Sequence, residues 1–256
     1  MTQHHLNGTS PTALVTGASE GIGKAIAVGL AQDGWDVVVT DLETPLLAAV
    51  VADIQALGRQ ATALALDLRQ PEKFPQVIAT LGAQCPTLSL LVNNAGVPSL
   101  SKPAVSTTVA DWESVNDTNL KGTFFMTLAF GQWLIAHGNP GSVISLSSTH
   151  GSVGFAGAAV YGIGKAGLNQ MTRMLAIEWA AHGIRLNAIA PGTTLTPSRQ
   201  SSLNNPQRRE TMLARIPLNR FGTPEEIAAS VRYLASPLAS YITGQVLHLD
   251  GGLTAY

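Results

Sequence analysis

The stretch "TALVTGASEGIGKAIAVGLAQDG", residues 12–34, decides the fold class of this 256-residue chain. Its opening residues are typical of a buried strand, and the residues after the turn repeat apolar side chains at helical spacing. Gly17, Gly21 and Gly23 lie between the two patterns. Glycines at this place permit a tight turn and let the backbone approach a pyrophosphate at the N-terminus of a helix. The stretch therefore predicts a strand–turn–helix unit that binds a dinucleotide.

The rest of the chain repeats this alternation of short apolar runs and longer helical patterns. Further strands are expected at "WDVVVTD" (35–41), "QATALALDL" (60–68), "LSLLVNNAG" (88–96), "GSVISLSS" (141–148), "IRLNAIAPG" (184–192) and "GQVLHLDGG" (244–252). Helices are expected at 45–58, around 111–137, at 158–182 and over 224–235. Seven strands separated by helices predict an α/β fold, a doubly wound parallel sheet with helices on both faces.

One polar segment interrupts this rhythm. Residues 193–222, "TTLTPSRQSSLNNPQRRETMLARIPLNRFG", are long for a plain connection, and such insertions are usually lids or disordered loops. We expect a substrate lid there, within a single domain that spans 12–256. The polar residues 1–11 are expected to form a flexible tail.

The composition narrows the classes of partner and compartment. The formal net charge is −1 and only 12% of the residues are charged, which argues against a nucleic-acid or anionic-membrane partner. Cys85 is the single cysteine, so an internal disulfide and a multi-cysteine metal site are excluded. No apolar run approaches the roughly 18 residues of a membrane span. A soluble, cytoplasmic protein is the expectation.

The acidic residues near the glycine turn indicate which dinucleotide is bound. Asp41 ends the second expected strand, where a carboxylate can accept hydrogen bonds from both ribose hydroxyls of an adenosine. Its charge would repel a 2′-phosphate, and Leu42 and Glu43 supply no cation to receive one. Glu20, inside the turn, adds further negative charge. The sequence therefore predicts NAD rather than NADP.

A second stretch, "SSTHGSVGFAGAAVYGIGK" (147–165), points to catalysis. Tyr161 and Lys165 are four residues apart, so on a helix their side chains share one face. A free phenol has a pKa of about 10 and is a weak base at neutral pH. An ammonium ~4 Å away, at an effective dielectric of ~20, stabilises a phenolate by about 4 kcal/mol. Lys165 is therefore sufficient to make Tyr161 a usable general base.

Ser148 and His150 precede this pair. Ser148 ends the fifth expected strand, and its hydroxyl could hydrogen-bond a substrate oxygen or serve as a plain helix or turn cap. His150 is expected to line the substrate pocket or to face solvent. A serine hydrolase is not expected, because Ser148 does not lie in a Gly-x-Ser-x-Gly elbow and the one such match, residues 17–21, falls in the glycine turn. The histidines show no ligand spacing, so no metal site is expected.

In their order and spacing these motifs resemble the short-chain dehydrogenase/reductase family over residues 12–252. The shared motifs are "TGASEGIG" (16–23), Asp67–Leu68, "NNAG" (93–96), Asn119 in "NLKG", the set Ser148, Tyr161 and Lys165, "PG" (191–192) and "TGQVLHLDGG" (243–252). The resemblance implies a Rossmann-type fold, hydride transfer between an alcohol and a nicotinamide, and a homotetramer with helices 111–137 and 158–182 in an interface. It also selects Ser148, rather than Ser147, as the catalytic serine.

The resemblance also implies the roles of individual residues. Asn119 is expected to hold a water that links Lys165 to solvent, which completes a catalytic set of Asn119, Ser148, Tyr161 and Lys165. Substrate contacts are expected from Ser148, His150, Tyr161 and Thr193. From the residues alone, Asn93 and Asn94 would form a structural turn, and that interpretation is kept for Asn94. The cofactor-binding residues are expected to be Gly17, Ser19, Glu20, Gly21, Ile22, Gly23, Asp41, Leu42, Asp67, Leu68, Asn93, Ala95, Gly96, Tyr161, Lys165, Pro191, Gly192, Thr194 and Thr196.

The expected pocket segments 98–102, 149–155 and 193–215 are rich in hydroxyls, amides and guanidinium groups. Such a pocket favours oxidation of a secondary alcohol in a sugar, polyol or vicinal diol over a sterol or long acyl chain. Because Arg199, Arg208 and Arg209 carry positive charge, a sugar acid stays a further candidate for the substrate. A 3-oxoacyl thioester reductase is the alternative enzyme, although such reductases usually use NADPH. A non-catalytic dinucleotide-sensing protein is the alternative from another class.

Overall fold

A seven-stranded parallel sheet forms the centre of the molecule, as the sequence predicts. The computed structural model describes residues 10–42, 45–199 and 204–255. The strands are β1 (Thr12–Thr16), β2 (Asp36–Asp41), β3 (Ala61–Ala65), β4 (Leu88–Asn93), β5 (Gly141–Leu146), β6 (Ile184–Pro191) and β7 (Val246–Leu249). Their order is β3-β2-β1-β4-β5-β6-β7, so the chain reverses direction across the sheet between β1 and β4. Open parallel sheets bind ligands at such a reversal, beyond the carboxyl ends of the strands.

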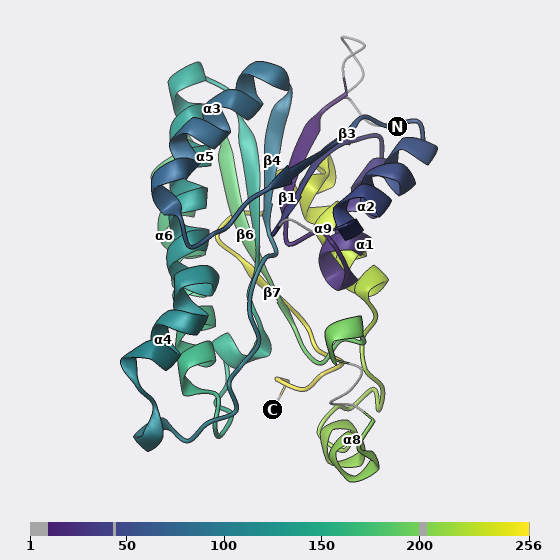
Figure 1. Ribbon diagram of the computed structural model, residues 1–256, viewed down its shortest axis with the longest axis vertical. Coiled ribbons are helices and arrows are strands. Elements are labelled where there is room, and N and C mark those ends of the chain that lie inside the picture. The colour runs from purple at the N-terminus through teal and green to yellow at the C-terminus, as the bar shows by residue number, and fades with distance from the viewer. Residues whose placement is uncertain (1–9, 43–44, 200–203, 256) are drawn as a thin grey trace.

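Helices cover both faces of this sheet (Figure 1). One layer holds α1 (Gly21–Gln32), α2 (Pro45–Ala56) and α9 (Pro224–Ala235). The other holds α3 (Phe74–Gln84), α4 (Val109–Asn116), α5 (Thr123–His137) and α6 (Ala159–Trp179). Among the described residues, no helix is both long and apolar enough to cross a bilayer.

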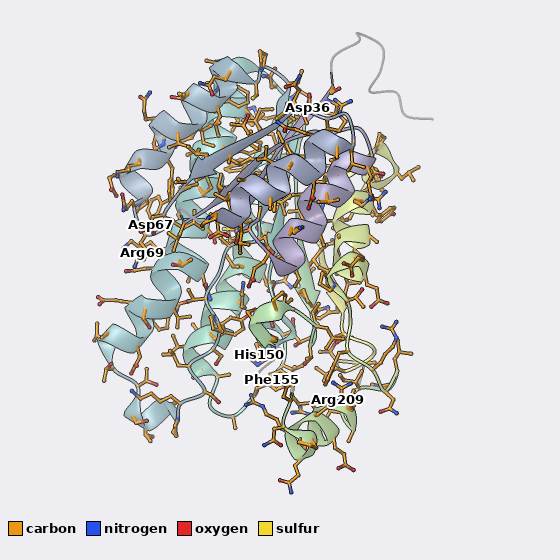
Figure 2. All side chains as sticks on the ribbon, turned by 45° about the vertical axis from the view of Figure 1, so that its right-hand side comes forward. Asp36, Asp67, Arg69, His150, Phe155 and Arg209 are labelled. Carbon is orange, nitrogen blue, oxygen red and sulfur yellow. The ribbon has the colours of Figure 1, made fainter. Side chains whose placement is uncertain are left out.

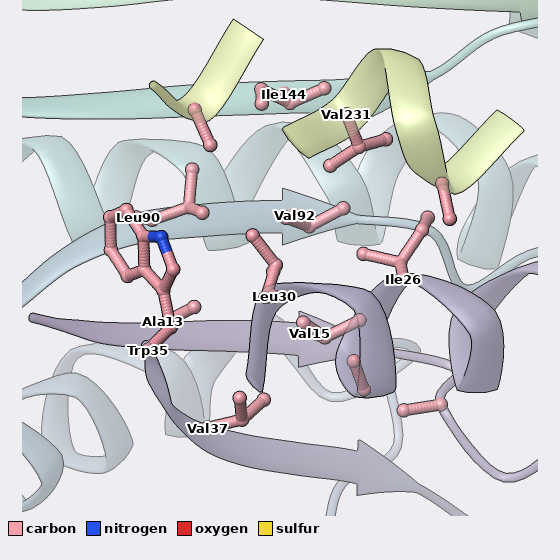
Figure 3. Close-up of a cluster of buried hydrophobic side chains, with 14 of the residues drawn as sticks. Ala13, Val15, Ile26, Leu30, Trp35, Val37, Leu90, Val92, Ile144 and Val231 are labelled. Carbon is pink, nitrogen blue, oxygen red and sulfur yellow. The ribbon is translucent and has the colours of Figure 1, made fainter. Parts of the chain in front are cut away.

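Alternation along the strands divides the apolar residues between two cores. Ala13 and Val15 of β1 face α1 and α9, whereas Leu14 lies in the core on the opposite face. Figure 3 shows the first core, in which Leu30 of α1 and Val231 of α9 meet the strand residues. Both faces are buried, which explains why the strands read as continuous apolar runs.

Two helical regions differ from the expectation. Residues 111–137 are not one helix, because a π-helical segment, Asp117–Gly122, separates α4 from α5. Gly122 approaches the end of the β3 region so closely that an added Cβ would lie 2.3 Å from Leu68 O. The helix α3 was not predicted at all. Its first turn contains Pro75, a residue that sequence reasoning reads as a breaker but that the first turn tolerates.

The polar excursion 193–222 is closed at its base. Leu195 N donates to Gly222 O over 2.9 Å, and Gly222 N donates to Thr193 O over 3.0 Å. Within it, α8 (Pro206–Leu213) leads to a small core of Ile216 and Phe221. Residues 200–203 of the expected lid, residues 1–9 of the expected tail and Glu43 lie outside the described residues.

Candidate active site

A cavity of about 610 Å³ lies at the carboxyl ends of the strands, at the reversal between β1 and β4. Its walls come from the turn after β1, from the ends of β2, β4, β5 and β6, and from α6. These are segments far apart in the sequence, and the sheet brings them together.

The turn between β1 and α1 fits the pyrophosphate of a dinucleotide. Gly17 and Gly21 have φ of +64° and +56°, in the left-handed region that glycine adopts without strain. An added Cβ on Gly17 would lie 2.6 Å from Ala95 Cα, and one on Gly23 would lie 2.0 Å from Gly17 O. Glu20 precedes the helix without a side-chain cap, which leaves the first N–H groups of α1 to a ligand. The cradle therefore depends on three glycines and an open helix N-terminus.

Asp41, at the end of β2, is held beside this turn. Its Oδ2 accepts hydrogen bonds from Ser19 Oγ at 2.6 Å and from Ser19 N at 3.2 Å. Its Oδ1 accepts one from Leu42 N at 2.8 Å. The carboxylate is thus fixed at the cavity wall between the glycine turn and β2, where an adenosine ribose would lie.

A second acidic residue, Asp67, lines the cavity beyond β3 and is paired with Arg69 (Figure 2). Arg69 Nη2 lies 2.6 Å from Asp67 Oδ2, and Arg69 Nε donates to both carboxylate oxygens. These hydrogen bonds lower the pKa of Asp67 to about 2. Asp67 therefore stays ionised over the whole neutral range.

The predicted catalytic side chains Ser148, Tyr161 and Lys165 line the same cavity. The ammonium of Lys165 lies 5.6 Å from the centroid of the Tyr161 ring. Lys165 is only 5% exposed, and its Nζ donates to Leu146 O over 2.6 Å. Helix α6 supplies the tyrosine and the lysine, and the end of β5 supplies the serine. The arrangement places a hydroxyl donor, a phenol and a fixed cation around one space.

Asn119 lies behind this group rather than on the cavity wall. It is fully buried in the π-helical segment, where its Oδ1 accepts from Val97 N at 2.7 Å and its Nδ2 donates to Val97 O at 2.9 Å. An added Cβ on Gly96 would lie 3.0 Å from Asn119 Oδ1 and 3.8 Å from Lys165 Nζ. Asn119 therefore fixes the segment after β4, at Gly96 and Val97, which lies between Asn119 and Lys165.

His150 is part of an aromatic cluster with Tyr161 and with Phe155, which Figure 2 labels next to it. Its ring stacks on Phe155 with centroids 4.0 Å apart and meets the Tyr161 ring edge-on at 5.4 Å. Its Nδ1 lies 3.3 Å from Ser148 Oγ. Burial, and then the charges of Arg199 and Arg215, lower the pKa of His150 to about 4. The imidazole is therefore neutral at physiological pH.

Most of the expected cofactor residues line the cavity, and four expected site residues do not. Asn119, His150 and Thr193 are absent from the described wall, as is Asn93. Asn93 differs because its side chain is buried in the sheet, where Nδ2 donates to Thr127 Oγ1 at 2.8 Å. Its neighbour Asn94, expected to be only a turn, lines the cavity and donates from Nδ2 to Gly17 O at 2.7 Å.

Sequence reasoning missed several wall residues. They are Leu66, Val97, Ser114, Thr118 and Leu146, which belong to no motif and to none of the expected pocket segments, whereas Pro98 and Ser198 fall inside the expected segments 98–102 and 193–215. Arg69 also lines the wall, and its position two residues after Asp67 was the signal that could have found it. Of the three arginines that left a sugar acid open, Arg199, Arg208 and Arg209, only Arg199 lines the described cavity.

Comparison with known proteins finds dehydrogenases and reductases that match almost the whole chain. A family model described as enoyl-(acyl carrier protein) reductase matches residues 17–254. The 2-dehydro-3-deoxy-D-gluconate 5-dehydrogenase of Escherichia coli K12 is 35% identical and covers 95% of each chain. A 3-oxoacyl-[acyl-carrier-protein] reductase of Synechocystis is 39% identical over 97% of this chain and 98% of the relative.

A solved structure agrees with these relatives. A protein of Agrobacterium tumefaciens, described as a 2-deoxy-D-gluconate 3-dehydrogenase with bound NADP, superposes with a TM-score of 0.89. It is 37% identical and covers 96% of this chain and 97% of its own. With the sheet order, the glycine turn and the Ser–Tyr–Lys group described above, the chain is therefore a member of the short-chain dehydrogenase/reductase family, an oxidoreductase that uses a nicotinamide cofactor.

Proposed function

We propose that this enzyme oxidises a secondary alcohol of a sugar, polyol or vicinal diol to the ketone or lactone, with NAD as the oxidant. The observation that carries the proposal is that Ser148, Tyr161 and Lys165 share one cavity with the glycine turn and Asp41. A bound nicotinamide would accept or return the hydride, which no side chain can do.

The side chains supply the proton chemistry and the positioning. Ser148 donates a hydrogen bond to the substrate oxygen and stabilises the charge that develops there. Tyr161 takes the hydroxyl proton of the alcohol as a general base. Lys165, held by its hydrogen bond to Leu146 O, keeps a positive charge beside the phenol. Asn119 acts as a positioning residue through its two hydrogen bonds with Val97.

Asp41 supports NAD over NADP. Its carboxylate is fixed by Ser19, so a 2′-phosphate at this place would meet a negative charge in a fixed position. The relative from Agrobacterium tumefaciens contains bound NADP, so cofactor choice varies among similar proteins and has to be measured for this chain.

The residues of the cavity wall support the proposal of a polar substrate. The wall includes the polar side chains of Thr194, Ser198 and Arg199, and Phe and Trp do not occur among its described residues. Hydroxyl-rich ligands need such fixed donors and acceptors, whereas sterols and long acyl chains need apolar walls. The dehydrogenase of Escherichia coli is named for a gluconate derivative, which also supports a hydroxyl-rich substrate.

A 3-oxoacyl thioester reductase is the second candidate, because the Synechocystis relative has that name and 39% identity. A screen of NAD and NADP reduction separates the two. We expect turnover with secondary alcohols of sugars, polyols or diols to exceed turnover of hydroxyacyl thioesters at least tenfold in kcat/KM. The reverse ranking would overturn the proposal in favour of the reductase.

We further propose that the protein works in the cytoplasm as a homotetramer, with α5 and α6 in an interface. The free thiol of Cys85 suits a reducing compartment, and the exposed apolar side chains of α6 support an interface.

A further inference from the structure

The hydroxyl hydrogen of Ser148 has to point in one direction for the serine to act on a substrate. The side chain is 7% exposed and lines the cavity. A hydroxyl has one hydrogen to donate and two lone pairs that accept. Ser148 therefore stabilises a negative substrate oxygen only while no group of the protein accepts that hydrogen.

His150 meets the serine hydroxyl at two of its own atoms. Its backbone N donates to Ser148 Oγ over 3.3 Å, and its ring Nδ1 lies 3.3 Å from the same oxygen. Both contacts follow from the local fold, because Ser148 caps the 3₁₀ turn Thr149–Gly151 and such a cap brings the residue two positions later back to the serine. His150 thus approaches Ser148 without belonging to the described cavity wall.

The imidazole ring of His150 is held in place from several sides. It is half-buried, stacks on Phe155 with centroids 4.0 Å apart (Figure 2), and meets the Tyr161 ring edge-on at 5.4 Å. Its backbone lies against α6, where an added Cβ on Gly162 would be 3.0 Å from His150 O. Nδ1 therefore faces Ser148 Oγ in a fixed geometry.

The effect on Ser148 depends on which ring nitrogen of His150 carries the hydrogen. The imidazole is neutral at physiological pH, chiefly because burial lowers its pKa, so it has a single N–H. With that hydrogen on Nε2, the lone pair of Nδ1 accepts the serine hydrogen and withdraws it from the substrate. With the hydrogen on Nδ1, the ring and the backbone N of His150 both donate to Ser148 Oγ, and the serine hydrogen is left for the cavity.

We propose that His150 is a positioning residue that carries its hydrogen on Nδ1, donates it to Ser148 Oγ and so directs the serine hydroxyl to the substrate oxygen. The inference rests on the role proposed for Ser148 and adds a partner to it. An oxygen that accepts two hydrogen bonds also donates its own more strongly, because hydrogen bonds in a chain polarise one another. Neither residue transfers a proton, since the proton of the alcohol goes to Tyr161.

The tautomer can be observed directly by ¹⁵N NMR of protein labelled only at histidine, at neutral pH with saturating NAD. His137 is the reference within the same spectrum, because its Nδ1 lies 2.8 Å from Trp133 O and a carbonyl oxygen only accepts. Loss of a signal in His150→Asn or His137→Asn assigns each ring. We expect His150, like His137, to have a protonated Nδ1 and an unprotonated Nε2. A protonated Nε2 with a bare Nδ1 in His150 would overturn the inference.

A pair of variants measures what the hydrogen bond does for turnover. His150→Phe keeps a ring beside Phe155 but has no donor, whereas the amide nitrogen of His150→Asn takes the place of Nδ1. The substrate is the sugar, polyol or diol with the highest kcat/KM in the screen described above. We expect His150→Phe to lower kcat about tenfold with little change in KM, the size of effect expected for one hydrogen bond, and His150→Asn to lower kcat less than about threefold.

A matched control comes from another histidine that lies beside an aromatic ring. His137 ends α5, its ring centroid is 5.0 Å from that of Trp133, and it is not part of the described cavity wall. His137→Phe should therefore change kcat less than twofold. If His150→Phe does not fold, as judged by circular dichroism, His150→Leu takes its place, and the NMR result on the wild type does not depend on either.

A double-mutant cycle separates positioning of Ser148 from a general structural role. In a Ser148→Ala background, His150→Phe should change the residual kcat less than twofold, because the group through which His150 acts is gone. An equal loss in both backgrounds overturns the inference and leaves the proposed function intact. An unchanged kcat for His150→Phe alone overturns it as well. A near-normal kcat for Ser148→Ala would overturn the role proposed for Ser148, and the inference with it.

Discussion

Tyr161 and Lys165 are placed by different parts of the fold, although they share one helix turn. Lys165 is buried, and its hydrogen bond to Leu146 O ties the ammonium to the end of β5. Tyr161 faces the cavity with its ring 5.6 Å from that ammonium. A buried charge that is fixed by the backbone cannot follow the substrate, so it favours the ionised phenol in one geometry.

Removal of the phenolic hydroxyl tests the assigned base. Tyr161→Phe should lower kcat by about 10³-fold, because positioned general acid–base catalysis contributes roughly 10²–10⁴-fold. Cofactor binding, measured by calorimetry, should change little since the ring remains. A variant with near-normal kcat would show that another group takes the proton.

Asp41 should set the choice of cofactor. We expect the wild type to prefer NAD over NADP by about 100-fold in kcat/KM, which corresponds to about 2.7 kcal/mol. Asp41→Asn keeps an oxygen that can accept from Ser19 but removes the charge, so it should reduce the preference at least tenfold. Steady-state kinetics with both cofactors measure this. Equal use of NAD and NADP by the wild type would contradict the role of Asp41.

His150 should make the stability depend on pH. Its pKa is lowered to about 4 by burial and by Arg199 and Arg215, whereas a histidine in an unfolded chain has a pKa of about 6.5. Between these values the unfolded chain binds more protons, so the free energy of unfolding falls as the pH falls from 6.5 towards 4. Above pH 6.5 both states are neutral at this site and the penalty vanishes.

The variant His150→Gln does not titrate in this window. Its free energy of unfolding, measured with urea, should therefore fall less between pH 7 and pH 5 than that of the wild type. Because the ring is partly exposed, we expect a difference of about 1 kcal/mol rather than the full electrostatic value. Parallel pH profiles for the two proteins would contradict the lowered pKa.

Single residues were predictable where spacing constrained them. Ser148, Tyr161 and Lys165 follow a pattern that a helix turn and a strand end impose. Asn93 was expected at the cofactor and Asn94 in a plain turn, whereas Asn94 is the one on the cavity wall. Successive strand residues point to opposite sides, and the sequence does not show at which residue β4 ends. Asn93 is the last residue of that strand and lies in the sheet, and Asn94 turns to the cavity.

Elements were predictable where their periodicity was clear. The strands and the helices α1, α2, α6 and α9 have strong apolar patterns, and the structure has all of them. The π-helical segment Asp117–Gly122 has no signal of its own in the sequence, and it brings Gly122 so close to Leu68 that an added Cβ would lie 2.3 Å from Leu68 O. Such contacts arise from the tertiary structure and cannot be read from local sequence.

The glycine turn should tolerate no side chain at Gly23. An added Cβ would lie 2.0 Å from Gly17 O and 2.5 Å from Asn94 Nδ2, so Gly23→Ala should move the strand–helix turn. We expect a loss of stability of about 2 kcal/mol or more and at least a tenfold weaker binding of NAD. Gly154→Ala is the control, because nothing lies within 4 Å of its added Cβ. Similar stability and NAD affinity for the two variants would contradict the close contact.

At the scale of the molecule, the helix α6 has apolar side chains on two of its sides. One side packs into the core of the sheet with Leu168, Met171 and Leu175. On another side of the helix lie Ile163, Met174 and Ile177. Met174 comes 11 residues and Ile177 comes 14 residues after Ile163, which is close to whole turns of a helix. They are exposed by 54%, 53% and 81%. Exposed apolar side chains gathered on one side of a helix are typical of a contact with another protein.

The stripe on α6 should be a subunit interface of the proposed homotetramer. Ile177→Glu places a charge at its most exposed position, so it should convert tetramers to smaller species in sedimentation velocity. Leu57→Glu is the control, because Leu57 follows α2 in the opposite helix layer and is also exposed, by 43%. It should leave the mass unchanged. A monomeric wild type would contradict the tetramer. An unchanged mass for Ile177→Glu would contradict the interface, because an unpaired carboxylate buried in the contact costs several kcal/mol.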